Sequence, residues 1–354
     1  MTRRGLLFLP GLGWRTSRAA PPSEPKNISF PLAAIENSVT PPDLFFVRDH
    51  FREPELSLDS WKLTIEGRVS HRLELSLADL LESPTRKMEA VLECAGNAAG
   101  GPAVGNGLWE GVPLADLLHQ AGVQADATQV LLEGADAGRL LQDSPELPYT
   151  RLVPLEKCRG PESMVALKLQ GRLLPRKNGF PARALFPGWY AMDSVKWLRR
   201  IVVLGPDDPP QAFYDSGMNK LYNRVIETAS GGRTVKRVAA LQVKSAIAWP
   251  SDQTRLPAAR HAVRGFAWSG GGAVRSVDVS FDGGRTWNAA TLEQPPKPLA
   301  WVRWSFPWVA APGEHVLMSR ATDETGSKQP LRREAGRKDG YELNFCAPVR
   351  CRVV

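Results

Sequence analysis

The stretch AVLECAGNAAGG, Ala90 to Gly101, joins a buried-strand pattern to a glycine-rich turn that carries a single thiol, Cys94. The apolar residues before the thiol form a run that is short enough for a central strand. Gly96 permits a tight backbone, and Asn97 is able to hydrogen-bond the sulfur. The turn can therefore present a thiol to a bound group, although free cysteines are commonly inert core residues.

The segments around this stretch alternate between strand and helix patterns. Short apolar runs predict strands in WKLTIEGRVS (61–70), TQVLLEGAD (128–136) and SVKWLRRIVVL (194–204). Helical spacing marks LSLADLLES (75–83), with Ser76 as a plausible N-cap, and VPLADLLHQAGV (112–123). Strands that alternate with short helices predict a mixed α/β sheet rather than a helical bundle.

The second half of the chain has a different pattern. GPDDPP (205–210) ends the last of these strands, and a polar connector runs to about Ala239. Beyond it, AVRGFAWSGGGAVRSVDVSFDGGRTWNAATLE (262–293) shows strand after strand with glycine-rich turns, which is typical of a β-sandwich. We therefore expect a first domain over 27–235 and an immunoglobulin-like second domain over 236–354.

Composition narrows the functional classes. The chain has 354 residues, 43% of them apolar, and a formal net charge of +8. The basic residues are scattered rather than interleaved with aromatic ones, which argues against a nucleic-acid-binding surface. The four cysteines include no C-x-x-C pair and no zinc-ligand grouping, so neither a disulfide scaffold nor a zinc site is expected.

The amino terminus, MTRRGLLFLPGLGW, places Arg3 and Arg4 before a short apolar run, as in a twin-arginine export signal. That run is too short to span a bilayer, and no other segment resembles a membrane span. Residues 1–26 are therefore expected to be an export signal, which implies a periplasmic protein, or else a disordered basic tail of a cytoplasmic one.

Two further groups of residues have the chemistry of an anion site. In FFVRDHF (45–51), Arg48 and His50 would lie on the same side of an extended segment, where a guanidinium can bind an oxyanion and an imidazole can add a hydrogen bond. In LPRKNGFPARALFPGWYAMDSVKWLRR (174–200), a turn could fold Arg183 and Lys196 toward one cleft. Without further context, an exposed arginine, a half-buried histidine and a proline-rich loop would explain the same residues.

Five motifs in order resemble the sulfite oxidase family of molybdenum enzymes. They are ECAGN (93–97), AVGNGLWEGVPLADLL (103–118), EGAD (133–136), NGFPARALFPGWYAMDSVKWLRRIVV (178–203) and GFAWSGGGAVRSVDVSFDGGRTW (265–287). The resemblance extends from about Asn27 to Val354. It implies an α+β protein in which a mixed α/β molybdopterin-binding catalytic domain precedes an all-β immunoglobulin-like domain that pairs two subunits in a homodimer.

The resemblance also implies roles for individual residues. Cys94 would be the one protein ligand of molybdenum, which a thiolate suits as a strong donor. The implied substrate-pocket residues are Arg48, Trp109, Arg303 and Tyr214, with Tyr222 as the alternative tyrosine. The implied molybdopterin contacts are His50, Asp136, Asn178, Arg183, Ser194, Val195 and Lys196.

The activity implied by the resemblance is oxidation of sulfite to sulfate by oxygen-atom transfer. Because no haem signature is visible in the sequence, electrons would pass to a separate acceptor such as a c-type cytochrome. The alternatives are another sulfur substrate, as in a sulfane dehydrogenase or a sulfoxide reductase, or a catalytically silent paralogue that binds a cofactor or a partner.

Two departures from the family pattern bear on the substrate. Ala98 and Ala99 stand where sulfite oxidases usually have arginines, and Asn178 stands where animal enzymes commonly have a histidine. The missing positive charge could weaken binding of a sulfite dianion or make room for a bulkier substrate. The asparagine can donate a hydrogen bond but does not titrate near neutral pH.

Overall fold

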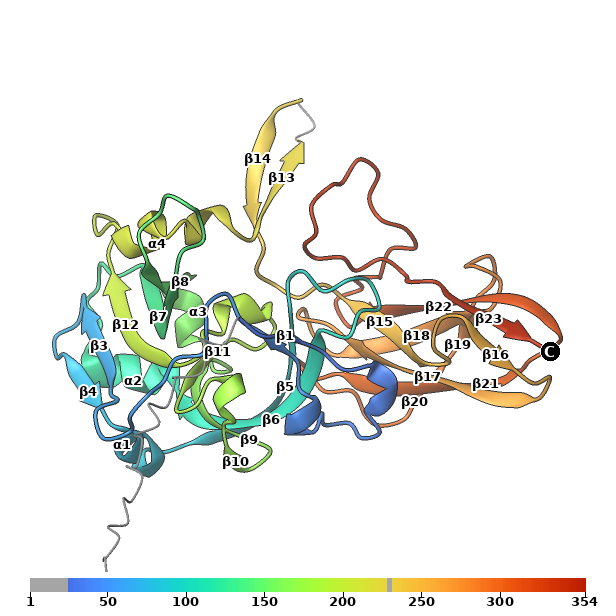
Figure 1. Cartoon of the computed structure of the whole chain (residues 1–354), viewed down its shortest axis with the longest axis horizontal. Helices are drawn as coiled ribbons and strands as arrows, with labels where there is room; N and C mark the ends of the chain where they lie inside the picture. Colours follow the sequence, from blue (N-terminus) through green and yellow to red (C-terminus); the bar gives the residue numbers. More distant parts are fainter. Residues whose placement is uncertain (1–24, 228–230) are drawn as a thin grey trace, which may run out of the picture.

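The computed structural model describes residues 25–227 and 231–354 of the chain. Figure 1 shows a sheet-rich amino-terminal part beside an elongated carboxy-terminal part built of strands. The export signal expected in the first residues lies outside the described residues. The observed architecture is the expected one, an α+β domain followed by a β-sandwich; the immunoglobulin-like strand order stays a prediction.

The amino-terminal part contains two five-stranded sheets. The first has the order β10-β9-β6-β5, with β11 also paired to β9; it consists of β5 (Arg86–Glu93), β6 (Val104–Pro113), β9 (Met164–Leu169), β10 (Arg172–Leu173) and β11 (Arg183–Leu185). The second has the order β4-β3-β12-β7-β8; it consists of β3 (Leu63–Gly67), β4 (Leu73–Leu75), β7 (Gln129–Gly138), β8 (Leu147–Pro154) and β12 (Leu198–Leu204). Only the β3–β12 pair is parallel in these two sheets.

The helices are short, as the sequence pattern predicts. They are α1 (Leu77–Glu82), α2 (Leu114–Ala121), α3 (Leu155–Arg159) and α4 (Gln211–Asp215). Separate 3-10 turns are η2 (Pro42–Leu44), η3 (Arg176–Asn178), η4 (Ala191–Asp193) and η5 (Met218–Lys220). Ser76 caps α1 as expected, because its hydroxyl accepts the Asp79 N–H while the Asp79 carboxylate accepts the Ser76 N–H. Gly122 ends α2 in the left-handed conformation.

The segments before and after this domain lie on its surface or project from it. Residues from 25 onward form an arm in which β1 (Asn27–Ile28) pairs with β2 (Val47–Arg48) and η1 (Leu32–Ala34) buries Leu32. The polar connector contains α4 and a two-stranded hairpin of β13 (Asn223–Glu227) and β14 (Arg233–Arg237). That hairpin projects from the top of the molecule in Figure 1.

The carboxy-terminal part is a sandwich of two sheets. One has the order β15-β17-β21-β20, with β15 (Lys244–Trp249), β17 (Arg260–Trp268), β20 (Thr291–Leu292) and β21 (Val302–Val309). The other has the order β16-β23-β22-β18-β19, with β16 (Thr254–Leu256), β18 (Val274–Ser280), β19 (Asn288–Ala289), β22 (Gly313–Asp323) and β23 (Val349–Val353). The predicted turn at DGG separates β18 from β19, and Gly283 and Gly284 both have positive φ there.

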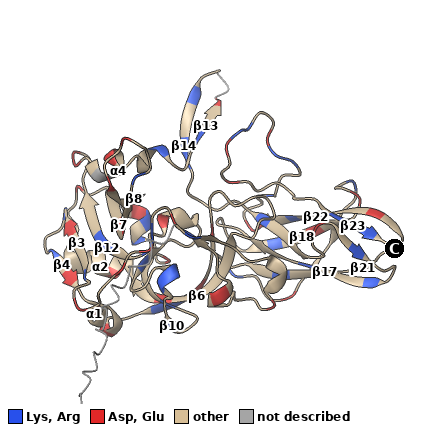
Figure 2. Cartoon of the chain, in the orientation of Figure 1, with Lys and Arg blue, Asp and Glu red and all other residues tan. Residues whose placement is uncertain are grey.

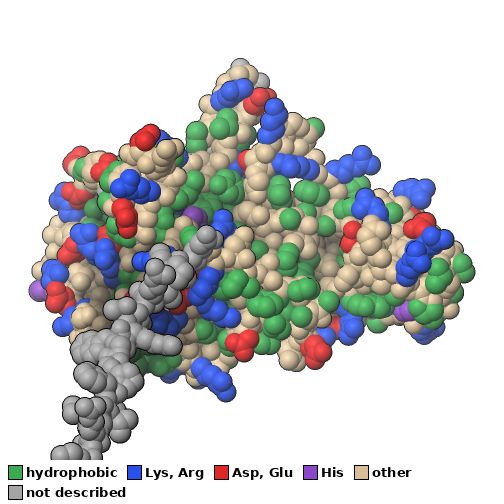
Figure 3. Space-filling view, in the orientation of Figure 1, with side chains coloured by type: hydrophobic (Ala, Val, Ile, Leu, Met, Phe, Trp, Pro, Cys, Tyr) green, Lys and Arg blue, Asp and Glu red, His purple; other side chains and the backbone are tan. Residues whose placement is uncertain are grey.

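A shared hydrophobic core joins the two parts. It combines Val91, Ala95, Tyr190, Met192 and Tyr222 of the first part with Ala246, Phe266, Trp268 and Trp301 of the second. Figure 3 shows hydrophobic side chains gathered over this junction as well. Because the core includes the residue next to Cys94, the sandwich helps to fix the loop that carries this thiol.

Charges of both signs are spread over the two parts in Figure 2. This distribution fits the scattered basic residues of the sequence. Among the described residues, no helix has the length and apolar character needed to cross a membrane.

Candidate active site

One cavity of the amino-terminal part collects most of the residues that the sequence singles out. About 640 Å³ of empty space, the open mouth included, lies at the meeting point of the β2 loop, the β5 loop and the segment before β12. Nine of the predicted site residues line it, namely Arg48, His50, Cys94, Asp136, Asn178, Arg183, Ser194, Val195 and Lys196.

The Cys94 loop is held by Asn97 rather than by contacts of the thiol. The Asn97 amide donates to a Glu93 carboxylate oxygen at 3.0 Å and to the Gly101 carbonyl at 3.1 Å, while its oxygen accepts the Ala103 N–H at 3.0 Å. A Cβ at Gly101 would lie 2.5 Å from that oxygen, so the loop requires glycine there. The sequence suggested that Asn97 hydrogen-bonds the Cys94 sulfur. In the structure its side chain instead closes the loop that presents this sulfur.

The Cys94 thiol faces the cavity from the end of β5. Burial raises its pKa above the ordinary value, and the Gly96 N–H and the charge of Arg48 oppose that rise. A metal that bound here would have to displace the thiol proton.

Arg48 and His50 line the same cavity, as the alternation of an extended segment predicts. The Arg48 side chain is exposed, and its Nη1 donates to the Asp49 carbonyl at 3.0 Å. No carboxylate of the described residues forms an ion pair with it. Arg48 is therefore available to bind an anion at the mouth of the cavity.

His50 is packed between two tyrosines. Its ring stacks on Tyr149 at 4.7 Å between centroids, and its Nε2 hydrogen-bonds the Tyr222 hydroxyl. Burial, with the nearby charges of Arg48, Arg151 and Lys196, lowers the pKa of His50 to about 3. The imidazole is therefore neutral at physiological pH and acts as a hydrogen-bonding group rather than as a cation.

The structure distinguishes between the two candidate tyrosines. Tyr214, in α4, is 49% exposed and does not line the cavity. Tyr222 is 7% exposed, lines the cavity and contacts His50. The geometry therefore places Tyr222, the alternative, at the site and leaves Tyr214 outside it.

A buried charged cluster forms one wall of the cavity. Lys196 forms an ion pair with Asp49, and its ammonium also lies 4.1 Å from the centroid of the Trp197 ring. Burial lowers the pKa of Lys196 to about 8 and raises that of Asp136 to about 7. Asp136 Oδ1 has no hydrogen-bond partner within the described chain, and a Cβ at Gly134 would lie 2.4 Å from it, which explains the glycine of EGAD.

The predicted contacts in NGFPAR and SVKW surround a second cation. The Arg183 guanidinium donates to the Ser194 carbonyl at 3.0 Å and to the Asn178 carbonyl at 3.2 Å. Burial lowers the pKa of Arg183 to about 10, so it remains charged at neutral pH. The Ser194 hydroxyl accepts the Phe186 N–H at 3.1 Å, while Asn178 Oδ1 is buried without a partner in the described chain.

Trp109 and Arg303 lie away from the cavity surface. Trp109 is fully buried behind Arg183, whose guanidinium lies 5.6 Å from its ring centroid. Arg303, in β21, forms an ion pair with Glu293 at 3.0 Å. Within this chain, Trp109 supports the wall from behind, and Arg303 belongs to the sandwich surface.

Ala98 and Ala99, which follow the thiol in the same loop, are absent from the cavity wall. Neither Ala98 nor Ala99 lines the cavity, and Ala99 instead borders a separate groove formed with the amino-terminal arm and the sandwich. Within this chain, the positions that depart from the family pattern therefore contribute no side chain to the wall of the candidate site.

Sequence analysis missed several residues of the site. Tyr149 and Arg151 alternate along β8, and Tyr149 contacts the site directly, whereas Arg151 lies 5.1 Å from the Tyr222 ring centroid. Arg151 is fully buried and pairs with Asp193 at 2.8 Å. The sequence pattern that could have identified these two residues is their two-residue spacing, which places an aromatic and a cationic side chain on one face of a strand. Asp49, Lys177 and Trp197 also line the cavity.

The raised pKa of Asp136 predicts a pH dependence of stability in the cofactor-free protein. The folded form holds a proton up to about pH 7, whereas the unfolded form loses it near 3.8, so this group stabilises the fold at low pH and that contribution is lost as pH rises toward 7. The contribution of His50 to the free energy of unfolding changes with pH in the opposite direction, because the pKa of His50 is lowered in the folded form. We therefore expect the stability difference between wild type and Asp136→Asn to change between about pH 4 and 7 in urea titrations. A constant difference would contradict a raised pKa.

Comparison with known proteins agrees with the fold. Residues 50–213 match the family model described as an oxidoreductase molybdopterin binding domain, and residues 235–336 match a Mo-co oxidoreductase dimerisation domain. Chicken sulfite oxidase is 33% identical over 91% of this chain and 73% of its own length, and human mitochondrial sulfite oxidase is 32% identical over 85% and 59%. The chain thus spans about three fifths of the human enzyme's length.

A solved structure matches nearly the whole chain. The sulfane dehydrogenase SoxCD of Paracoccus pantotrophus superposes with a TM-score of 0.80 at 28% identity, covering 96% of this chain and 92% of its own. The architecture is therefore that of a molybdopterin-binding oxidoreductase with an attached dimerisation domain. The chain belongs to the sulfite oxidase family of molybdopterin-dependent oxidoreductases.

Proposed function

We propose that this protein oxidises sulfite to sulfate with a molybdenum–molybdopterin cofactor and passes the electrons to a separate carrier such as a c-type cytochrome. The observation that carries the proposal is that the Cys94 thiol and the Arg48 guanidinium line one cavity. A thiolate is a suitable metal ligand, and an unpaired guanidinium binds a tetrahedral or pyramidal oxyanion.

The lining residues fit the proposed cofactor chemically. Cys94 would ligate the metal, since no cluster of three or more metal-binding side chains exists among the described residues to hold one alone. The partnerless oxygens of Asp136 and Asn178 would meet the N–H groups of the pterin. Arg183 and Lys196 provide cations for its anionic groups.

The cofactor, when bound, supplies oxygen-atom transfer and accepts two electrons. The chain's own residues bind and orient the anion. Arg48 holds it at the mouth, and the neutral His50–Tyr222 pair offers fixed hydrogen-bonding atoms deeper in the cavity. Phe45 and Phe46 line the same space with apolar rings, which exclude water and strengthen these polar interactions.

A sulfane substrate is the second candidate, because the solved structure similar along nearly the whole chain is a sulfane dehydrogenase. Purified holoenzyme, tested with cytochrome c and either sulfite or a thiol-bound sulfane, separates the two. Reduction with the sulfane but not with sulfite would overturn the sulfite assignment. Protein from a cofactor-competent host that contained neither molybdenum nor pterin would instead support a catalytically silent paralogue.

Replacing Arg48 with methionine should mainly weaken substrate binding. We expect the KM for sulfite to rise about 10-fold to 100-fold, since a charge-assisted hydrogen bond contributes about 1.5–3 kcal/mol. Steady-state kinetics with cytochrome c measure the change, and Arg52→Met, a nearby exposed arginine that does not line the cavity, is the control. An unchanged KM in Arg48→Met would remove Arg48 from the substrate site.

The match to a dimerisation domain supports a homodimer paired through the sandwich, which we propose to be immunoglobulin-like. Light scattering at micromolar concentration would refute the dimer if it gave a monomer mass.

The arginine pair near the amino terminus supports twin-arginine export to the periplasm. Replacing Arg3 and Arg4 with lysine should then keep the protein in the cytoplasm, as cell fractionation would show.

A further inference from the structure

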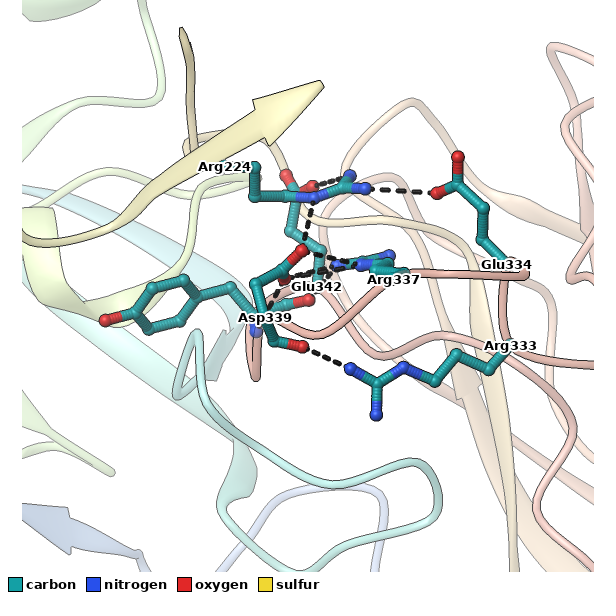
Figure 4. Close-up of polar contacts among 7 residues, drawn as sticks. Arg224, Arg333, Glu334, Arg337, Asp339 and Glu342 are labelled. Carbon is teal, nitrogen blue, oxygen red and sulfur yellow. Dashed lines mark hydrogen bonds and ion pairs between the residues drawn. The ribbon is translucent and has the colours of Figure 1, made fainter. Parts of the chain in front are cut away.

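Arg224 connects the β13 hairpin to a loop of the sandwich. Its guanidinium lies 2.7 Å from a Glu342 oxygen, 3.2 Å from a Glu334 oxygen and 3.4 Å from an Asp339 oxygen. All three carboxylates belong to the loop over residues 331–344, as Figure 4 shows. The Arg224 side chain is 12% exposed and that of Glu342 is 2% exposed, so solvent screens this pair less than a surface ion pair, whereas Glu334 is largely exposed.

The 331–344 loop reaches the active site at two points. The ring of Tyr341 lies 5.2 Å from the ring of Tyr222, and the Glu342 N–H donates to the Ala95 carbonyl at 3.1 Å. Ala95 follows the thiol residue Cys94. The loop therefore contacts both the active-site tyrosine and the turn that presents the thiol.

The loop is held in this shape by its own charges. Asp339 accepts the Tyr341 N–H at 3.1 Å and pairs with Arg337 at 3.0 Å, and the Arg333 guanidinium donates to the Asp339 carbonyl at 2.5 Å. Among residues 25–227 and 231–354, Arg224 is the one outside the loop whose side chain bonds to this network (Figure 4). Its loss would remove the cation that ties the loop to the catalytic part.

Tyr222 depends on such support. Its backbone has φ +57°, a left-handed conformation that costs about 1–3 kcal/mol in a non-glycine residue and persists only where neighbours enforce it. Its hydroxyl must also stay within reach of His50. Arg224, two residues further along the chain, and Tyr341, against the ring, constrain it from two sides.

We propose that Arg224 is a positioning residue of the active site, which acts through the 331–344 loop to hold Tyr222 at the cavity. This role rests on the proposed function, because it concerns the same site. The sandwich would then contribute to catalysis by fixing a side chain of the other domain, in addition to any part in pairing subunits.

Limited trypsin digestion of the full-length protein tests the attachment without any turnover. The loop contains Arg332, Arg333, Arg337 and Lys338 as cleavage sites. In Arg224→Met we expect cleavage within the loop to be at least about 10-fold faster than in wild type, because weakening the attachment of the loop by about 1.4 kcal/mol raises the population of its detached form by that factor. Equal rates would overturn the proposal.

Arg68→Met is the matched control. Arg68 also pairs with two carboxylates, Asp208 at 2.6 Å and Asp126 at 3.1 Å, but both belong to the catalytic domain. Its replacement should leave cleavage of the 331–344 loop unchanged. If Arg224→Met does not fold, Glu342→Gln, which keeps the backbone bond to Ala95, provides the same comparison with a smaller effect.

A double-mutant cycle tests the route through Tyr222. Arg224→Met should lower kcat/KM about 10-fold to 100-fold in the wild-type background, whereas Arg224→Lys should keep most activity. In a Tyr222→Phe background the same change should have little further effect. Fully additive losses would overturn the route, while an absence of turnover with every sulfur substrate would refute the proposed function and leave the trypsin result to decide the attachment.

Discussion

Cys94→Ser is expected to lose sulfite turnover by at least about 100-fold. Replacing a residue that only hydrogen-bonds a metal ligand typically lowers metal affinity or activity about 10-fold to 100-fold. Cys94 would be the ligand itself. A serine hydroxyl keeps the size and the loop geometry, but it is a harder donor that stays protonated near neutral pH. Molybdenum content by elemental analysis and turnover with sulfite, sulfanes and sulfoxides measure the effect.

Cys158→Ala is the control for this variant. Cys158 is a fully buried thiol in α3, and it does not line the cavity. Its replacement should retain molybdenum and activity, because only packing is lost. Full activity of Cys94→Ser with every substrate would overturn the assignment of the metal ligand.

Lys244→Met should destabilise the protein by about 3–5 kcal/mol, the usual cost of removing one partner of a buried ion pair. Lys244, at the start of β15, pairs with Glu93, the last residue of β5, and both side chains are at most 1% exposed. The same carboxylate accepts the Trp268 indole N–H at 2.8 Å and the Asn97 amide at 3.0 Å. Removing the cation leaves a buried negative charge at the junction of the two domains, directly before the loop that carries Cys94.

The chain offers a matched control for this variant as well. Lys297 pairs with Glu89 at 2.8 Å across the same domain boundary, but its side chain is 66% exposed. Lys297→Met should therefore change the free energy of unfolding by only about 0–1 kcal/mol. Urea-induced unfolding followed by fluorescence and by circular dichroism gives both values. Equal and small effects of the two substitutions would show that the Glu93–Lys244 pair does not hold the domains together.

Local sequence patterns predicted the elements and the side chains that those elements carry directly. The alternation of Arg48 and His50 placed both at the cavity because strand geometry repeats every two residues. The N-cap at Ser76 and the turn at Gly283 and Gly284 followed in the same way from local chemistry. The motifs around Cys94 located the thiol at the end of β5.

Features that depend on contacts between distant segments could not be predicted in this way. The sequence favoured Tyr214, with Tyr222, eight residues later, as the alternative, but α4 turns the first to solvent and the hairpin base turns the second toward His50. Arg151 is buried because Asp193, on another segment, compensates its charge. The sequence alone also could not show that Ala98 and Ala99 do not line the cavity.

The hydrophobic core shared by the two domains limits how this protein can be divided or recombined. A fragment that ended after β14 would expose the faces of Val91, Ala95 and Tyr222 that now pack on Trp268 and its neighbours. Those exposed groups would lie beside the thiol and the tyrosine of the candidate site. The catalytic domain therefore cannot be exchanged as an independent module, and recombination within the family should preserve the junction together with the cavity.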